Sequence, residues 1–282
     1  MVFSCSQPQF AVLPPVSETV SDAFHDVQFS TRRHDELLAQ MQRLRGQVYL
    51  QDGAITQDAL TSDGRHATSV DHHSWHVLSL DHEGKVVACL RYLEERSATV
   101  FDDLLVRHAA LAQCPVAGVR FRRSVERAMS PARQMRIGFG EVGGWAVAEE
   151  RRHTLESLRI ILATYGLLQL LGSAAGVATA TVRHGSSTIL RRIGLTALQA
   201  DGEDLAPYYD PNYSCEMEVL QFDSRFPNPK YLDQVRQLSM CLANAPVICR
   251  ETRAPEREIR RLWGALEPVG VQESLASSLA GI

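Results

Sequence analysis

The feature that most constrains the fold is an alternation of strand and helix patterns between residues 138 and 192. Residues 138–147 have the pattern of a strand in which four glycines mark bends or a bulge. Residues 151–171 form the strongest helical pattern in the chain, because apolar side chains recur every three or four positions until Gly172. A short apolar strand at 177–182 and a helix at 186–192 follow. Strand, helix and strand in this order predict two parallel strands joined by a crossover.

The remaining patterns divide the chain into three parts. Residues 1–29 lack helical or strand periodicity and are interpreted as a loosely held leader. Residues 30–225 hold the main α/β (α+β) domain, which we expect to add these elements: a helix at 30–49, a hairpin of strands at 74–81 and 85–92, an arginine-rich helical stretch at 101–135, and strands near 196–200 and 215–222. Residues 226–282 are interpreted as a C-terminal extension with helices at 231–242 and 256–266.

Composition argues against several classes of protein. With 45% hydrophobic and 22% charged residues, the 282-residue chain is long enough for one sizeable core. The first 30 residues contain no basic start followed by an apolar run, and the most apolar window, 160–177, is interrupted by Gln169 and Ser173. The six cysteines are scattered without a C-x-x-C pair, which indicates neither a zinc knuckle nor a disulfide framework. We therefore expect a cytoplasmic protein without a membrane span.

Three motifs occur in a fixed order along the main domain: V-V-A-C-L-R-Y at 86–92, G-E-V-G-G-W-A-V at 140–147 and A-T-A-T-V-R-H-G-S-S-T-I-L-R-R-I-G-L at 178–195. Together they resemble the N-acyl amino acid synthases and their relatives, the acyl-homoserine lactone synthases, over about residues 32–223. The resemblance implies a GNAT-like acyltransferase fold, with a mixed central sheet, two splayed parallel strands and flanking helices. It also implies transfer of a long-chain fatty acyl group from acyl carrier protein to the α-amine of an amino acid, without a tightly bound cofactor.

Departures from the two families favour the amino acid synthases. Lactone synthases typically carry an arginine three positions after the central glutamate, whereas Glu141 is followed by Gly144, and their tryptophan in the loop after the first helix is missing. Residues 208–211 (Y-Y-D-P) and 222–224 (F-D-S) are also similar to the amino acid synthases. Acyltransferases of exosortase systems are similar too, so the acceptor stays open. Two alternatives remain: a lactone synthase that uses S-adenosylmethionine, and a non-catalytic module that binds an acyl ligand.

The resemblance implies where the donor lies. Its pantetheine arm is expected between residues 141–147 and 177–182, with the thioester oxygen near the backbone N–H groups of Trp145 to Val147. Glu141 is the first choice for the base that deprotonates the acceptor amine, and the alternative is a structural carboxylate paired with Arg91. Arg91 is itself expected to bind the substrate. Further site residues are expected on and just after the second splayed strand: Thr179 and Thr181 for substrate binding, His184 for catalysis and Ser187 for the pantetheine, with helix capping as the alternative for the serine.

The basic residues point to an acidic donor. Residues 149–154 (E-E-R-R-H-T) lack the Gly-x-Gly that would cradle a pyrophosphate, so Arg151 and Arg152 are expected to hold the single phosphate of a carrier-bound pantetheine, unless they are merely solvated. The stretch from Arg107 to Arg136 carries seven arginines against one glutamate, a basic patch that would suit acyl carrier protein or a solvated helix face. Nucleic acid is disfavoured because aromatic residues are not interleaved with these charges.

Histidines gather before and within the predicted hairpin, at positions 66, 72, 73, 76 and 82. Their spacing is not a recognised metal-ligand pattern and no cysteine joins them, so no metal is expected. Asp63, Asp71 and His72 are instead expected to line the acceptor pocket, as the resemblance implies for the loop over the site. A capping or loop role is the alternative for these three residues.

Overall fold

The computed structural model describes residues 9–16, 18–95, 100–183 and 185–251. The chain divides into two units after Arg250, and the predicted helix at 256–266 lies outside the described residues. Everything that follows concerns the first unit. No helix among the described residues is both long and apolar enough to cross a membrane.

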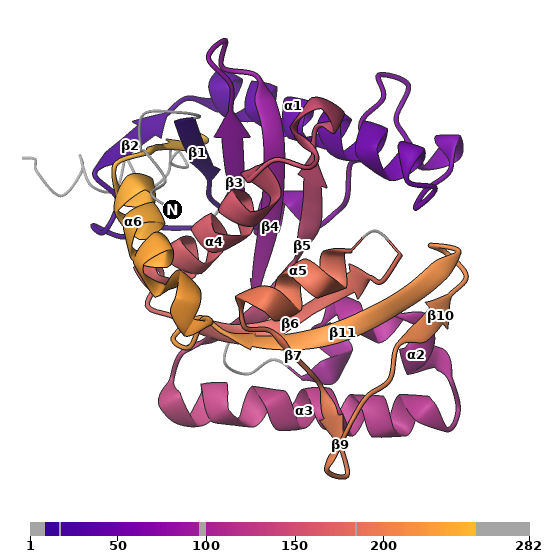
Figure 1. The fold of residues 1–282 in the computed structure, drawn as a ribbon. Coiled ribbons are helices and arrows are strands. Elements are labelled where there is room, and N and C mark those ends of the chain that lie inside the picture. The colour runs from indigo at the N-terminus through magenta and orange to yellow at the C-terminus, as the bar shows by residue number, and fades with distance from the viewer. Residues whose placement is uncertain (1–8, 17, 96–99, 184, 252–282) are drawn as a thin grey trace, which may run out of the picture. The chain divides into compact units, whose positions relative to one another are not determined.

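One large mixed sheet organises this unit (Figure 1). Its strands run across the sheet in the order β10 (Tyr208–Asp210), β11 (Cys215–Asp223), β6 (Ala174–Thr181), β5 (Gly138–Val147), β4 (Val86–Glu95), β3 (Trp75–Leu80), β1 (Gln9–Leu13), β12 (Pro246–Cys249) and β2 (Asp26–Phe29). β7 (Thr196–Ala197) pairs with β11, while β8 (Gln199–Ala200) and β9 (Glu203–Asp204) form a separate hairpin. The predicted parallel crossover is confirmed, because β5 and β6 pair in parallel around helix α4.

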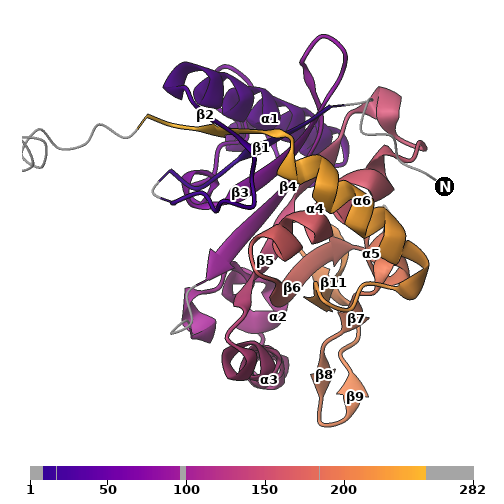
Figure 2. The ribbon, with the colours of Figure 1, turned by 90° about the vertical axis from the view of Figure 1, so that its left-hand side faces the viewer.

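Helices cover both faces of the sheet (Figures 1 and 2). On one face, α4 (Glu156–Leu170), α5 (Ser186–Ile193) and α6 (Leu232–Ala243) share a core with β4 residues such as Leu90 and Tyr92. On the other face, α1 (Thr31–Gln51) packs on Leu78 and Cys89, and α3 (Ala117–Met135) packs on Phe139 and Val177. The short helix α2 (Ala110–Gln113) precedes α3. Single 3-10 turns complete the fold: η1 (Gln57–Ala59), η2 (Asp71–His73), η3 (Phe101–Asp103), η4 (Leu105–His108), η5 (Glu149–Arg151) and η6 (Pro229–Tyr231).

The two central parallel strands pair over only part of their length. The β5–β6 register runs from Gly138 opposite Ala174 to Val142 opposite Ala178, and β5 then continues to Val147 along β4 alone. The register between β4 and β5 shifts where Gly144 takes a φ of +63°, a bulge conformation that favours glycine. Because a bulge bends its strand, β5 diverges from β6 beyond this point. The predicted splay of the two strands is therefore confirmed.

The N-terminal segment differs from the prediction. Residues 1–29 were expected to form a loose leader, but β1 lies inside the sheet between β3 and β12, and β2 forms the edge beyond β12. Phe10 to Leu13 are all buried, so this strand shows neither alternation nor helical spacing. β12 was missed for the same reason, and it lies in the segment 226–282 that was expected to be helical. Its partners, β1 and β2, lie more than two hundred residues earlier in the chain.

Two local expectations are also corrected. The crossover helix begins at Glu156 rather than at residue 151, because Arg151 belongs to η5 and His153 has a positive φ that interrupts helical geometry. Scattered cysteines were expected to stay unpaired, yet Cys241 is disulfide-bonded, since spacing along the chain does not decide which residues meet in the fold. Cys89, Cys114, Cys215 and Cys249 are free thiols.

Candidate active site

A buried ion pair lies beside the splay, between α1 and the loop that precedes β3. The Arg45 guanidinium donates to both carboxylate oxygens of Asp71, at 3.0 and 2.7 Å, and the two side chains are 1% and 0% exposed. Arg45 falls on the buried stripe of α1, four residues after Met41. Burying a single charge in a core is costly, and pairing it with an opposite charge offsets much of that cost.

Asp71 is the centre of a wider hydrogen-bond network. Its Oδ2 accepts from the Gln42 amide at 2.9 Å and from the Thr68 backbone N–H at 3.0 Å, while its carbonyl accepts from His76 Nε2 at 2.8 Å. Burial alone would raise the pKa of Asp71, but the Arg45 guanidinium and the Thr68 backbone N–H hold it well below its usual range. Asp71 is therefore a fixed anion, and the loop from Thr68 to the start of β3 is anchored on it.

Arg91 is the less satisfied cation of this cluster. It projects from β4 with a side chain that is 12% exposed, and its nearest carboxylate oxygen, on Asp71, is 3.9 Å away. Its Nε has no hydrogen-bond partner within the described chain. Burial raises the pKa of Tyr49 and of Tyr213, although both lie close enough to Arg91 for its charge to oppose that effect. The cluster thus has two arginines for one aspartate, beside two protonated phenols.

Glu141 lies on the same face of the sheet, diagonally across from Arg91. Glu141 is opposite Leu93 on β4, two residues from Arg91, and is 7% exposed. Its two carboxylate oxygens accept from the backbone N–H groups of Leu105 and Val106 in η4. Burial raises the pKa of Glu141, and these amides and the Arg91 charge offset only part of that effect. The alternative role, a direct ion pair with Arg91, is absent among the described residues, since Arg91 pairs with Asp71 instead.

The splay opens directly next to these residues. The part of β5 from Gly143 to Val147 and the part of β6 from Thr179 to Thr181 lie beyond the last β5–β6 pair. Strand alternation puts Thr179 and Thr181 on the face of Val177, which is also the face of Glu141 and Arg91. Trp145 packs on the opposite core, and its indole N–H has no partner within the described chain.

Several predicted site residues lie elsewhere or are already engaged. Asp63 is an exposed loop residue bound to Arg43 and Arg65, and His72 is exposed although its neighbour Asp71 is buried. The Ser187 hydroxyl donates to Glu218, a carboxylate that Arg191 also binds. His184 lies outside the described residues. The structure therefore places Arg91 close to Asp71 and to Glu141, with the two threonines on the same face of the sheet, whereas Asp63, His72 and Ser187 face solvent or are bound to other residues.

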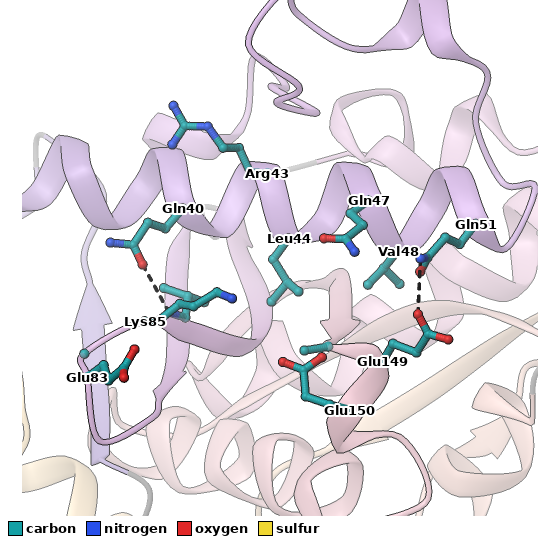
Figure 3. A pocket seen from close by; sticks show the side chains of 13 residues that line it. Gln40, Arg43, Leu44, Gln47, Val48, Gln51, Glu83, Lys85, Glu149 and Glu150 are labelled. Atoms are coloured by element: carbon teal, nitrogen blue, oxygen red, sulfur yellow. Dashed lines mark hydrogen bonds between the residues drawn. The ribbon is translucent and has the colours of Figure 1, made fainter.

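The predicted phosphate site sits at the end of β5. Arg152 forms two hydrogen bonds with Asp52, at 3.0 and 3.2 Å, so its charge is largely satisfied. Arg151 has no ion pair within the described chain and precedes α4 by one turn. A groove of about 400 Å³ adjoins η5, between α1 and the β3–β4 hairpin, and Gln51 reaches Glu149 across it (Figure 3). None of the predicted site residues lines this groove.

The basic patch lies away from the splay. Helix α3 packs on Phe139, Ala175 and Val177, which belong to the paired part of β5 and β6. Part of its charge is also neutralised, because Arg122 binds Asp102 and Glu126, and Arg120 binds Asp201. The histidines do not converge either. His76 is buried while His72, His73 and His82 are exposed, and no group of metal-ligating side chains occurs among the described residues.

The sequence analysis missed Arg45, Tyr49, His76 and Tyr213 as site residues. One signal was present: a charged residue on the apolar stripe of a helix, such as Arg45, has to find a partner in the core. His76 likewise occupies a core position of an apolar strand. Tyr213 carried no such signal. It belongs to the turn between β10 and β11, far along the chain from β4, and it comes near Arg91 only in the folded protein.

A mixed sheet with two splayed central strands, a crossover helix and helices on both faces is the arrangement predicted for GNAT-like acyltransferases. No protein-family model matches this sequence, and no curated protein sequence matches it either. Solved structures do match, and BjaI shares the overall fold.

Three such structures illustrate the similarity. BjaI, a CoA-dependent acyl-homoserine lactone synthase solved with SAM and isopentyl-CoA, gives a TM-score of 0.52 at 15% identity, over 90% of this chain and 98% of BjaI. FeeM, an N-acyl amino acid synthase from uncultured soil microbes, gives a TM-score of 0.43 at 11% identity, over 78% of this chain and 92% of FeeM. An acyl-CoA N-acyltransferase from Pseudomonas aeruginosa gives a TM-score of 0.41 at 13% identity, over 76% of this chain and 99% of that protein. The BjaI match establishes the GNAT-like fold, and the predicted resemblance is confirmed at that level.

Proposed function

We propose that this protein is an N-acyltransferase that moves a long-chain fatty acyl group from acyl carrier protein to the α-amine of an amino acid. The observation that carries the proposal is the position of the cation-rich Arg45–Asp71–Arg91 cluster, on the face of the sheet where β5 and β6 splay. The fold shared with BjaI supports the reaction class by analogy. The acceptor is argued from the site itself.

Arg91 provides the reason for an amino acid acceptor. A guanidinium that is nearly buried and only loosely paired favours a carboxylate ligand, which it can bind through two parallel hydrogen bonds. A bound α-carboxylate would also balance the excess positive charge of the two arginines. The α-amine of the same molecule would then lie toward the splay, between Arg91 and the threonines of β6.

The chemistry needs a base and a stabilised oxyanion. Glu141 is the proposed base, acting through a water: its raised pKa suits proton uptake, and two backbone amides fix its orientation. The neutral amine attacks the thioester carbon, and backbone N–H groups near Trp145 and Val147 stabilise the oxyanion, each worth a few kcal/mol. When the C–S bond breaks, the second amine proton leaves with the thiolate. The transfer is direct and involves no covalent enzyme intermediate.

The donor is proposed to enter along the open ends of β5 and β6. Arg151 is proposed to bind the phosphate of the pantetheine arm, a proposal supported by η5 having no glycine-rich cradle for a pyrophosphate. The acyl chain is proposed to enter the apolar core on the α4 and α5 side, where Val142, Leu190 and Phe222 line a small void. Carrier protein as donor, a long chain and a cytoplasmic location stay parts of this proposal.

The lactone synthase alternative is favoured by the BjaI fold but disfavoured at one position. Gly144 stands where those enzymes typically carry an arginine, and it has a positive φ that disfavours any side chain. A Cβ on Gly144 would lie 3.2 Å from the Arg91 Cβ and 3.4 Å from Arg45 Nη1. An arginine at this bulge would therefore be strained by the positive φ, and its side chain would crowd Arg91 and Arg45.

Acceptor preference tests the proposal. We expect the purified protein with palmitoyl-acyl carrier protein to acylate a free amino acid more efficiently than its methyl ester, because only the free acid has the carboxylate that Arg91 binds. Replacing Arg91→Met is expected to raise the acceptor KM about tenfold or more and to abolish the preference over the ester. Acylation would be measured as amide product by mass spectrometry. An unchanged preference in the variant, or lactone formed from S-adenosylmethionine, would contradict the proposal.

A further inference from the structure

One acidic residue bridges the end of the sheet at which β5 and β6 separate. The two strands are parallel, so their C-terminal ends lie at the same end of the sheet, which we call the mouth of the splay. Arg152 lies shortly after the end of β5, and Arg183 lies just after the end of β6. Both are bound by Asp52, the residue at which α1 ends. Asp52 therefore joins three segments that are far apart in the sequence.

The two arginines contact different groups of Asp52. Arg152 donates from Nη1 to Oδ1 at 3.0 Å and from Nη2 to Oδ2 at 3.2 Å, a bidentate geometry in which a guanidinium also binds phosphate. Arg183 donates from Nη2 to the Asp52 carbonyl oxygen at 2.9 Å. The side chains of Arg152 and Asp52 are 32% and 21% exposed, so both are open to solvent. An anion from solvent can therefore compete with this carboxylate for the Arg152 guanidinium.

The position of Asp52 at the C-terminus of α1 is electrostatically unfavourable. The carbonyl end of a helix carries a partial negative charge, which favours cations and disfavours carboxylates. The last turn of α1 contains no basic residue that could offset this charge. Gly53 follows with a φ of +68°, and a Cβ built on it would lie 4.0 Å from Arg183 Nη2, so the chain passes close to this arginine. The Asp52 carboxylate is thus stabilised by Arg152 and not by its own helix.

The end of α1 is attached to η5 at a second point. Gln51 donates to Glu149 at 3.4 Å, and both side chains are exposed (Figure 3). This hydrogen bond is longer than either bond between Asp52 and Arg152. Release of the Asp52 carboxylate would therefore leave a weak attachment between α1 and η5.

We propose that Asp52 is a latch: its carboxylate occupies Arg152 in the free protein, and the phosphate of the acyl donor displaces it. This inference rests on the proposed function, in which the pantetheine arm enters between β5 and β6 and Arg151 binds its phosphate. The phosphate takes the place of the carboxylate on Arg152, and the end of α1 separates from η5. A thioester without a phosphate leaves the latch closed. The closed latch lowers the apparent affinity for the donor, because only molecules with Asp52 released bind the phosphate.

Direct binding tests the latch without acyl transfer. Titration calorimetry would compare pantetheine 4′-phosphate with pantetheine, which lacks only the phosphate. We expect the wild type to bind the phosphate form at least about threefold more tightly, and Asp52→Asn to increase this ratio at least about threefold further. Arg152→Gln should bring the ratio close to one. An unchanged or lower ratio in Asp52→Asn would overturn the proposal, since a carboxylate that only positions Arg152 has that effect. So would the absence of any binding of the phosphate form up to about 10 mM.

Asp63→Asn is the matched control. Asp63 is also a carboxylate bound by two arginines, but these partners, Arg43 and Arg65, belong to α1 and to its own loop and not to η5. Its replacement should leave both affinities unchanged. Melting temperatures should change little in every variant, because exposed or partly exposed ion pairs contribute little to stability. The binding ratio needs no turnover, so the two failures are distinguishable. Amide formation without an effect of Asp52→Asn on the ratio contradicts the latch alone, whereas the absence of amide product contradicts the proposed function.

Discussion

At the scale of single residues, the protein depends on charges that are buried in pairs. Asp71 is 0% exposed and is held by Arg45, Gln42 and Thr68. Removing one charge of such a pair leaves the other uncompensated, which costs about 3–5 kcal/mol. We therefore expect Asp71→Asn to lower the free energy of unfolding by about that amount in urea denaturation. Asp63→Asn is the control: this carboxylate is 43% exposed and its ion pairs are worth about 0–1 kcal/mol. Equal losses in the two variants would contradict the account.

His76 predicts a pH dependence of stability. Burial lowers the pKa of this histidine from 6.5 to about 4, and its Nδ1 has no partner within the described chain that could accept a second proton. Between pH 6.5 and about pH 4, His76 is protonated in the unfolded chain but neutral in the folded protein. The contribution of neutral His76 to the free energy of unfolding is therefore fully present above pH 6.5 and decreases as the pH falls toward 4. The loss approaches about 3 kcal/mol at 1.36 kcal/mol per pKa unit.

The variant His76→Gln isolates this contribution. Its amide nitrogen can still donate to the Asp71 carbonyl, but it does not titrate. Urea midpoints measured at pH 7 and pH 4.5 should therefore differ less for the variant than for the wild type. The same pH slope in both proteins would show that His76 does not carry the effect.

At the scale of elements, a pair of glycines determines where β5 and β6 stay together. A Cβ on Gly176 would lie 1.9 Å from the Gly140 carbonyl oxygen, whereas a Cβ on Gly143, past the last strand pair, would meet only Arg91 Nη2 at 3.6 Å. Gly176→Ala should therefore separate the strands and lower stability by about 1–3 kcal/mol, the usual cost of overpacking. Gly143→Ala should change the melting temperature little. Similar melting temperatures for the two variants would refute this role of Gly176.

Element prediction from the sequence worked where the pattern was local. The helix α1, the β3–β4 hairpin, β5 and the crossover to β6 were all predicted close to their observed bounds, because each carries its own periodicity or glycine punctuation. β1, β2 and β12 were missed, since they are short, lack alternation and are defined by pairing with remote strands. For the candidate site, Arg91, Asp71 and Glu141 were named from the sequence and lie on one side of the sheet in the structure, and their roles stay predictions. Tyr213 was missed because a contact between distant segments leaves no pattern in the local sequence, whereas Arg45 was missed although its position on the apolar stripe of α1 was a signal.

At the scale of the whole molecule, the fold places the splay of β5 and β6 and the arginine cluster on one face of the sheet. The cluster favours a carboxylate-bearing acceptor, because it holds two arginines for one aspartate. The splay depends on the glycines of β5, since the strand bends where Gly144 has a positive φ. The proposed acceptor site therefore depends on the bend of this strand as well as on the arginine cluster.

The most direct test is mass spectrometry of lipid extracts from cells that express the wild-type chain or the Glu141→Gln variant. The account predicts new N-acyl amino acids with the wild type, reduced about 10²- to 10⁴-fold in the variant, as expected for loss of a general base. The masses would identify the acceptor and the chain length, and circular dichroism would check that the variant is folded. Wild-type extracts without any new acylated amine, despite folded protein, would contradict the central claim.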